Sequence, residues 1–452
     1  MDRIIDKCTH IIIDGKTMTI TEEDKDKIYA AAKDMAVLAL RVLALAVKTG
    51  DDSAAEDNLT FVGMVGMIDP PRPEAAGAVE IFKGADVTTI MITGDHRDTA
   101  FAIAKELGIA ETEDQCITGD DLNKMTQEEL NAAVPTLRVF ARVSPENKVM
   151  IVNAFRSYGH IVSMTGDGVN DAPSLKAADI GVAMGITGTD VAKGAADMVL
   201  TDDNFATIEK AIEEGRNIYN NIKKSVLFLL SSNLGEIITM FVAIIAGLAS
   251  PLKAIHILWV NLITDSLPGL ALGVDPGDPD IMKGRPRDPK ESLFANGGLA
   301  TTIFFGAVIG TITLSAFLFT PVTALMQAGD SVTLDSIIIL FKDELIYTQS
   351  QTYAFTVLAI SQLFNAMGMR NLNKSIFKFN HFNNRMMIVA FAVGFALQIS
   401  VTEIHFLTEV FGTVELSIRE WITLVGISTA PLWFHELFVL GRYLNRDKAA
   451  RS

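Results

Sequence analysis

The sequence has little cysteine and no excess of basic residues, and each shortage removes a class of protein. Only two cysteines, Cys8 and Cys116, occur among 452 residues, too few for a disulfide scaffold and consistent with a reducing cytosol. Asp and Glu outnumber Lys and Arg by 54 to 38, for a net charge of −16, which argues against a nucleic-acid partner. The first residues lack an apolar run long enough for a secretory signal, so we expect later segments to direct any membrane insertion.

Hydrophobic residues are abundant, at 49% of the chain, and they are concentrated after residue 225. Runs of about 20 apolar residues, the length needed to cross a bilayer, occur only there. The predicted transmembrane helices are six: about 226–248, 252–274, 299–321, 352–370, 386–402 and 421–440. The alternative is a large soluble α-protein with buried core helices, but segment length and charge asymmetry together favour a multi-pass protein of the lipid bilayer.

Basic residues gather at alternate connections between these runs. They are Lys223, Lys224, Lys283, Arg285, Arg287, Lys290, Lys374, Lys378, Arg385, Arg442, Arg446, Lys448 and Arg451. The intervening loops are acidic and poor in Lys and Arg. The positive-inside rule therefore predicts that the soluble head and the C-terminus lie in the cytoplasm.

The soluble part before residue 216 is predicted to be α/β. The β-branched strings VTTIMIT, LRVFARV and HIVSMTG each precede a helical stretch, which predicts a Rossmann-like parallel sheet with helices on both faces. Ligands in such folds bind at the carboxyl ends of the strands. Residues 1–58 differ: we expect one long helix over 22–48 and little else, as in a truncated domain.

Two of the predicted strands end in carboxylate turns. The string TGDGVND places Asp167 and Asp171 four residues apart among glycines that allow close approach of a ligand, and TGD recurs one strand earlier. Oxygen ligands of this kind suit Mg²⁺ bound to phosphate, and Lys148 could place a cation beside a phosphoryl group. The alternative is a polar turn that caps the next helix through Asn170 or Asp171.

Polar residues also recur inside the first two apolar runs. Asn233 and Glu236 lie three apart in the first, and Asn261, Thr264 and Asp265 share one helical face in the second. Ionisable groups in hydrocarbon mark a functional site by default. All the candidate ligands are oxygens, which favours a hard cation such as Ca²⁺. Hydrogen bonding between helices is the alternative.

Several strings resemble the phosphorylation domain of P-type ATPases, which has the haloacid-dehalogenase-like fold. They are MITGD, FARVSPENK, MTGDGVNDAPSLKAADIGVAMG and MVLTDDNFATI, in that order between Met91 and Ile208. The resemblance implies three parts: a remnant of the nucleotide-binding domain over 1–58, the phosphorylation domain over 59–215, and six transmembrane helices within 216–452. It also implies ATP and Mg²⁺ as cofactors.

The resemblance assigns roles residue by residue. Contacts to the phosphoryl group and its charge would come from Thr93, Gly94, Asp95, Lys148 and Asn170. Asp167 and Asp171 would hold Mg²⁺, Arg41 and Arg142 would reach the nucleotide, and Asp69 and Arg72 in MIDPPR would form the hinge at which the nucleotide domain rejoins.

The string WVNLITDSLPGLALG resembles the sixth span of calcium-transporting ATPases, and SSNLGE the fifth. This implies Ca²⁺ as the transported ion, bound by Asn233, Glu236, Asn261, Thr264, Asp265 and Gln362. Gln362 stands where the family has a glutamate. The number of ion sites, one or two, and the identity of the ion, Ca²⁺ or Mn²⁺, therefore stay open.

One motif of the family is missing. No DKTGT string, which carries the phosphorylated aspartate, occurs in the chain, and the actuator loop and first four spans have no counterpart. Without a carboxylate acceptor the covalent step cannot proceed. We therefore predict the C-terminal portion of a calcium-pump-like ATPase, inactive by itself, whose partner would be the missing N-terminal half. The alternatives are a membrane-anchored phosphatase, which also needs the missing Asp, and a non-catalytic cation-binding or regulatory protein.

Overall fold

The computed structural model describes residues 2–37, 40–48, 56–67, 70–372 and 374–449. The chain divides into two compact units. The first, here the head unit, comprises Met1–Glu213 and Met282–Pro289; the second, the membrane unit, comprises Glu214–Ile281 and Lys290–Ser452.

The N-terminal part of the head unit is a four-stranded sheet with two helices. The order of strands is β2-β1-β4-β3. The elements are α1 (Asp2–Ile5), β1 (Cys8–Ile13), β2 (Lys16–Thr19), α2 (Glu22–Val37), β3 (Arg41–Val47) and β4 (Leu59–Met67). Ile5, Ile11, Ile28 and Phe61 form its core.

The prediction of one long helix over 22–48 is wrong for the second half of that range. The helix α2 ends at Val37, and Arg41–Val47 is strand β3, paired antiparallel with β4. The segment RVLALAV alternates between the two faces of the sheet: Ala44 is buried, whereas Leu43 and Leu45 are exposed. A period of two fits a strand, and pairing with β4 outweighs the helix propensity of Leu and Ala.

The rest of the head unit contains parallel strands, as expected. One sheet has the order β5-β7-β6 and the other β10-β9-β8, and every pair in them is parallel. The strands are β5 (Met91–Thr93), β6 (Cys116–Thr118), β7 (Val139–Ala141), β8 (Ser163–Gly166), β9 (Ile180–Met184) and β10 (Met198–Leu200). The three predicted strands correspond to β5, β7 and β8; the others were not predicted.

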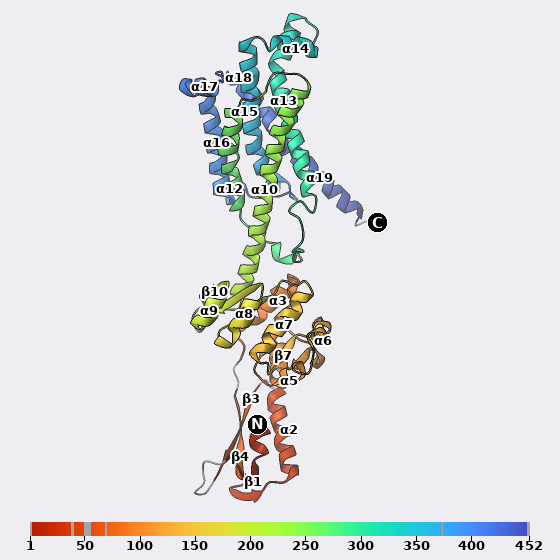
Figure 1. The fold of residues 1–452 in the computed structure, drawn as a ribbon, viewed down its shortest axis with the longest axis vertical. Helices are drawn as coiled ribbons and strands as arrows, with labels where there is room; N and C mark the ends of the chain where they lie inside the picture. Colours follow the sequence, from red (N-terminus) through yellow and green to blue (C-terminus); the bar gives the residue numbers. More distant parts are fainter. Residues whose placement is uncertain (1, 38–39, 49–55, 68–69, 373, 450–452) are drawn as a thin grey trace. The chain divides into compact units, whose positions relative to one another are not determined.

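Helices connect these strands (Figure 1). They are α3 (Pro73–Gly84), α4 (Arg97–Glu106), α5 (Gly119–Leu122), α6 (Gln127–Ala133), α7 (Pro145–Ser157), α8 (Ala172–Ala177) and α9 (Asp190–Ala195). Helix α7 contributes to two cores: Ile151 packs with Phe140 of β7, and Val152 packs with Met164 of β8. Ile92 of β5 contacts both cores, so the two parallel sheets share one set of packed side chains.

The membrane unit is helical. Its helices are α10 (Thr207–Ile245, which begins in the head unit), α11 (Ala254–Trp259), α12 (Ser266–Gly273), α13 (Gly298–Ala328), α14 (Leu334–Leu340), α15 (Glu344–Met369), α16 (Arg385–Glu403), α17 (His405–Phe411), α18 (Ile418–Ser428) and α19 (Ala430–Ala449). A π-helical turn, Val260–Thr264, joins α11 to α12.

Five helical segments of the described chain are long and apolar enough to cross a membrane. They are Ala206–Ile245, Ala254–Gly273, Gly298–Ala328, Arg385–Glu403 and Ile418–Gly441. The sixth predicted span, 352–370, falls in α15, which is 26 residues long but carries many Ser, Thr, Gln and Asn residues. Its polar side chains are buried among the other helices, including Ser350, Thr356 and Gln362, so α15 forms the centre of the bundle.

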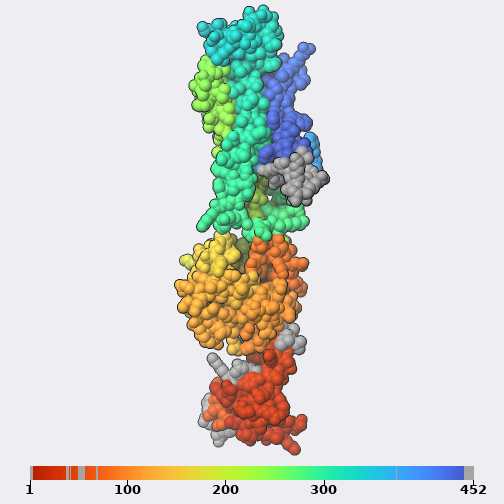
Figure 2. All heavy atoms as spheres, turned by 90° about the vertical axis from the view of Figure 1, so that its right-hand side faces the viewer, coloured from red at the N-terminus to blue at the C-terminus, as the bar shows by residue number. Residues whose placement is uncertain are grey.

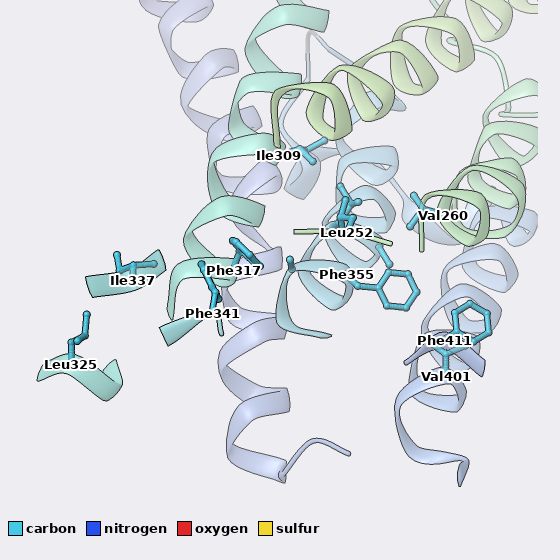
Figure 3. Packing of buried hydrophobic residues seen from close by; sticks show 13 residues of the cluster. Leu252, Val260, Ile309, Phe317, Leu325, Ile337, Phe341, Phe355, Val401 and Phe411 are labelled. Atoms are coloured by element: carbon cyan, nitrogen blue, oxygen red, sulfur yellow. The ribbon is translucent and has the colours of Figure 1, made fainter. Parts of the chain in front are cut away.

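Apolar side chains from six elements form the largest core of this unit (Figure 3). Phe355 of α15 is surrounded by Val260, Phe317 and Phe411, among others. Helix α13 packs along α15, and Figure 2 shows α13 (green-blue) beside α19 (blue) on one face of the unit.

Small residues let α10 and α13 approach closely. A Cβ added to Gly310 would lie 2.8 Å from Ile238, and one added to Gly306 would lie 2.9 Å from Leu234. On α10, a Cβ added to Gly235 would likewise lie 2.7 Å from Ile309. The spacing Gly306-x-x-x-Gly310 is typical of close helix pairs in membranes, and it positions the turn of α10 that carries Glu236.

Candidate phosphate and cation sites

The TGDGVND turn follows β8, and its geometry depends on Asp171. This buried carboxylate accepts hydrogen bonds from the backbone N–H groups of Asp167 (3.2 Å) and Gly168 (3.0 Å) and from Lys148 Nζ (2.5 Å). Burial by itself raises the pKa of Asp171, but Lys148 and the two N–H groups outweigh it and hold the pKa below its usual value. A Cβ on Gly166 would come within 2.4 Å of the Asp171 side chain, so only glycine fits there.

Lys148 is placed by the start of α7. Ser144 caps the helix: its Oγ accepts from Asn147 N at 3.3 Å, and Asn147 Oδ1 accepts from Ser144 N at 3.0 Å. Pro145 occupies the first turn, where its missing N–H costs nothing. The capped turn directs Lys148 at Asp171, and this pair joins α7 to the turn after β8.

Thr93 and Asp95 form a second small turn after β5. Thr93 Oγ1 donates to Asp95 Oδ2 at 2.8 Å, and Asp95 N donates back to Thr93 Oγ1 at 3.1 Å. The backbone N–H groups of Arg142 and Val143 bond the carbonyls of Asp95 and Thr93. The structure therefore brings this turn to the segment that leads into α7 and Lys148.

Asp167 is exposed and lines a pocket of about 280 Å³ together with Arg72, Thr187 and Asp203. Asp203 accepts backbone N–H groups from Ile186 and Thr187 at 2.9 and 2.7 Å; these and the Thr187 hydroxyl lower its pKa to about 2. Arg72 Nη1 donates to the carbonyl of Asp203 at 2.8 Å. Sequence reasoning had no signal for Asp203, whose role depends on a loop 16 residues upstream.

The other residues predicted for the phosphate and nucleotide sites of the head unit are Gly94, Arg142, Asn170, Arg41 and the hinge residue Asp69. Gly94, Arg142 and Asn170 are exposed. The side chain of Arg41 and the whole of Asp69 lie outside the described residues. An exposed carboxylate at Asp167, beside a cationic Lys148 already paired with Asp171, fits a hydrated Mg²⁺ that takes one or two carboxylates and phosphate oxygens. Asp171, with three donors, serves the shape of the turn.

In the membrane unit, Glu236 of α10 and Asp265 at the start of α12 both point into the bundle. They are 6% and 1% exposed, and they lie close enough for their charges to interact. Asn261 Nδ2 donates to Glu236 Oε2 at 3.0 Å and to the carbonyl of Ile257 at 3.0 Å. Thr264 is 1% exposed beside them, and Asn233 is half-buried.

Several buried oxygens of this cluster have no hydrogen-bond donor within the described part of the chain. They are Glu236 Oε1, both carboxylate oxygens of Asp265, Gln362 Oε1 and Asn365 Oδ1. Gln362 lies beside Glu236. An acceptor left without a donor in a dry interior is costly, and a cation of oxygen-ligand type is one group that can offset this cost. Among the described residues no group of three or more His, Cys, Asp or Glu comes together.

The second helix of the site is broken within the bundle. In the π turn at Val260–Thr264, Asp265 N donates to Val260 O, five residues earlier, at 2.9 Å. Such turns are frequent at functional sites. Pro268 lies in α12 and, because it has no N–H, leaves Thr264 O without its usual donor. The larger irregularity precedes it and was not predicted.

Sequence reasoning missed Asn365. It lies three residues after Gln362 on α15, is 1% exposed, and donates to Ser231 Oγ at 3.1 Å, which joins α15 to α10. Its i, i+3 spacing from Gln362 was the available signal.

Two protein families match this chain. "P-type ATPase, cytoplasmic domain N" matches residues 1–74, and "Cation transporting ATPase, C-terminus" matches residues 249–440. The calcium-transporting ATPase 1 of Bacillus cereus is 52% identical over 450 residues, 98% of this chain and 50% of that protein. The calcium-transporting ATPase of Bacillus subtilis is 42% identical over 99% and 48% of the two chains, and the human calcium-transporting ATPase type 2C member 1 is 38% identical over 95% and 44%.

Apolar helices that enclose buried carboxylates, joined to an α/β head with carboxylate turns, define an integral membrane protein with a soluble α/β part. The chain belongs to the P-type cation-transporting ATPase family, which confirms the resemblance of its motifs. It corresponds to the C-terminal part of the calcium-transporting members and spans about half the length of the curated relatives that it matches.

Proposed function

We propose that this chain supplies the cation site and part of the phosphorylation site of an ATP-driven pump that carries Ca²⁺ across a membrane. The observation that supports this most is the pair of buried carboxylates, Glu236 and Asp265, on adjacent membrane helices. Three of their four oxygens have no donor in the described ranges of the chain. Oxygen ligands in irregular geometry suit Ca²⁺ better than a soft metal. Asn233, Asn261, Thr264 and Gln362 complete the proposed ligand set.

In the head unit, the proposed roles follow from the two turns. Thr93, Gly94 and Asp95 orient the phosphoryl group, and Lys148 and Asn170 stabilise its charge at the edge of the TGDGVND turn. Mg²⁺ held by Asp167, with Asp171 shaping the loop, would neutralise phosphate charge. Arg41 and Arg142 contact ATP. The head has the haloacid-dehalogenase-like fold in this proposal.

The acceptor of the phosphate comes from elsewhere in the pump. No DKTGT string occurs in these 452 residues, and a covalent phosphoenzyme requires a carboxylate nucleophile. We propose that the part of the pump outside this chain supplies it, and that phosphorylation changes the packing of the membrane helices and exposes the cation site to alternate sides. Helix α10, which begins in the head unit and carries Glu236, provides a continuous covalent connection for this coupling.

The proposed topology has six spans, with α15 as the span that the others shield from lipid. Head and C-terminus lie in the cytoplasm, because Lys and Arg gather at the connections on that side.

The decisive experiment is ⁴⁵Ca²⁺ binding to the purified chain in detergent. Asp265→Asn and Glu236→Gln should each weaken binding by more than about 100-fold, because loss of even an outer-shell partner of a metal ligand costs 10- to 100-fold. Asp330→Asn, in an exposed loop, is the matched control and should leave binding unchanged. Unaltered binding in both site variants would sink the assignment, and competition with Mn²⁺ or Mg²⁺ would establish the preferred ion.

A further inference from the structure

Asp275, two residues after α12, is a charged residue inside the membrane unit that belongs to neither site. Its carboxylate is 5% exposed and accepts a hydrogen bond from Arg370 Nε at 2.7 Å, and Arg370 is itself 6% exposed. Lys224 Nζ lies 3.2 Å from the other carboxylate oxygen. Asn384 Nδ2 donates to Asp275 Oδ1 at 2.8 Å. One buried carboxylate thus compensates two cations.

Each partner comes from a different helix. Lys224 lies on α10, Arg370 ends α15, and Asn384 caps the start of α16. The backbone takes part as well: Asn221 of α10 donates to Asp275 O at 2.7 Å, and Asn384 donates to Ala271 O of α12 at 2.8 Å. The carboxylate therefore joins the middle of α10 to the ends of α12, α15 and α16.

The same end of α12 is held to α10 over a longer stretch. Ser225 Oγ donates to Gly269 O at 2.8 Å, and a Cβ on Gly277 would lie 2.1 Å from Asn217 Nδ2, so a larger residue at this position would displace the Asn217 side chain. The contacts at Asn217, Asn221 and Lys224 follow helical spacing along one side of α10.

We propose that Asp275 is a positioning residue for the cation site: it sets the register of α12 against α10, so that Asp265 faces Glu236. Asp275 lies ten residues beyond Asp265, about 15 Å along a helix, and Lys224 lies twelve residues before Glu236, about 18 Å. The two helices run in opposite directions, so contacts at Lys224–Asp275 and at Glu236–Asn261 fix their register at two heights. This inference rests on the proposed function.

Removal of the carboxylate alone would do more than delete a contact. Arg370 and Lys224 would remain as uncompensated cations at a buried position, and breaking one side of a buried ion pair is strongly disruptive. Replacement of both partners by neutral groups of similar volume is tolerated far better. Comparison of the single variant Asp275→Asn with the double variant Asp275→Asn/Arg370→Met therefore separates the effect of an uncompensated buried charge from the effect of losing the Asp275 carboxylate.

The first readout is the distance between α10 and α12, measured by double electron–electron resonance. Spin labels go on cysteines at Leu230 and Leu270, both exposed on the outside of the bundle, in a background with Cys8 and Cys116 replaced by Ser. We expect one narrow distance in the unmodified chain, a broad or shifted distribution in Asp275→Asn, and a return toward the narrow one in Asp275→Asn/Arg370→Met. An Asp275→Asn distribution identical to that of the unmodified chain would overturn the proposal.

The second readout is ⁴⁵Ca²⁺ affinity of the monodisperse fraction, which a purely structural role would leave unaltered. Asp275→Asn should weaken it by about 10- to 100-fold, as outer-shell partners of metal ligands do. Asp278→Asn is the matched control, because it lies in the same loop but pairs with Lys374 at a more exposed position; it should leave affinity and distance unchanged. If the unmodified chain binds no Ca²⁺, the proposed function loses its support, while the spin-label distances still decide the register.

Arg370→Lys is a milder variant, which tests the proposal if Asp275→Asn does not fold. It retains the charge but loses the planar group that reaches both Asp275 and the carbonyl of His381. We expect a folded protein with a broadened α10–α12 distance, and an unchanged distance here contradicts the proposal equally.

Discussion

The Asp171 carboxylate in the head unit receives three hydrogen bonds, whereas both carboxylate oxygens of Asp265 in the membrane unit find no donor among the residues that the structure describes. Both residues are buried. The first is satisfied by its own chain and therefore shapes a turn without any ligand. The second leaves a cost that a cation or a proton must offset. Satisfaction by the chain, more than burial, distinguishes Asp171, which organises its turn, from Asp265, which we propose binds the cation.

The largest expected effect concerns what the head unit cannot do by itself. The purified chain, incubated with γ-³²P-ATP and Mg²⁺, should incorporate no acid-stable, hydroxylamine-sensitive phosphate, because no DKTGT carboxylate is present to accept it. A complete relative treated in parallel serves as the positive control. Incorporation by this chain would show that another of its carboxylates is the acceptor.

In the membrane unit, the close contact of α10 and α13 can be tested by comparing a crowded glycine, Gly310, with an uncrowded one, Gly426. Gly310→Ala should destabilise the detergent-solubilised protein by about 1 to 3 kcal/mol, because the new methyl group would overlap Ile238. Gly426→Ala, on α18, meets nothing within 4 Å and should stabilise by about 0.5 to 1 kcal/mol through helix propensity. Thermal unfolding measures both, and equal shifts would contradict the close contact.

In the head unit, the ion pair that organises the TGDGVND turn should be worth about 2 kcal/mol, as for hydrogen bonds to charged groups. Lys148→Met removes the cation and should accelerate hydrogen exchange over 163–177, because Asp171 then loses its closest donor. Lys176→Met, at an exposed position of α8, is the control. Equal protection in the two variants would mean that the backbone donors suffice to hold Asp171.

These expectations also show which parts of the head were predictable. Strands β5, β7 and β8 and the carboxylate turns after β5 and β8 followed from local strings, since each of these strands is followed by its own turn and helix. Strand β3 did not follow, because RVLALAV has the composition of a helix and becomes a strand only through pairing with β4. Asp203 was equally hidden, because its donors lie on the loop at Ile186 and Thr187.

The smallest effect is the acid sensitivity of that loop. The pKa of Asp203 is about 2 in the folded chain, against about 3.9 for an unfolded Asp. A lowered folded pKa means that its stabilisation is complete above about pH 4 and is lost as the pH falls toward 2. Hydrogen exchange at Ile186 and Thr187 should therefore lose protection over that interval.

The matched variants sharpen this prediction. Asp203→Asn should show lower protection of the loop at pH 7 and less change between pH 4 and 2, whereas the exposed Asp14→Asn should keep the profile of the unmodified chain. A steep acid loss that persists in Asp203→Asn would assign the sensitivity to another group.

The sequence by itself determined the class of protein, the division into an α/β head and apolar helices, and the residue types of both sites, because periodicity, hydrophobic length and motif spacing are local properties. Only the tertiary structure decided which carboxylates are satisfied, where the second helix of the cation site breaks, and that Asp275 joins four helices. The contacts Asn261–Glu236 and Asn384–Asp275 join residues 25 and 109 positions apart, and such contacts exist only once the chain has packed.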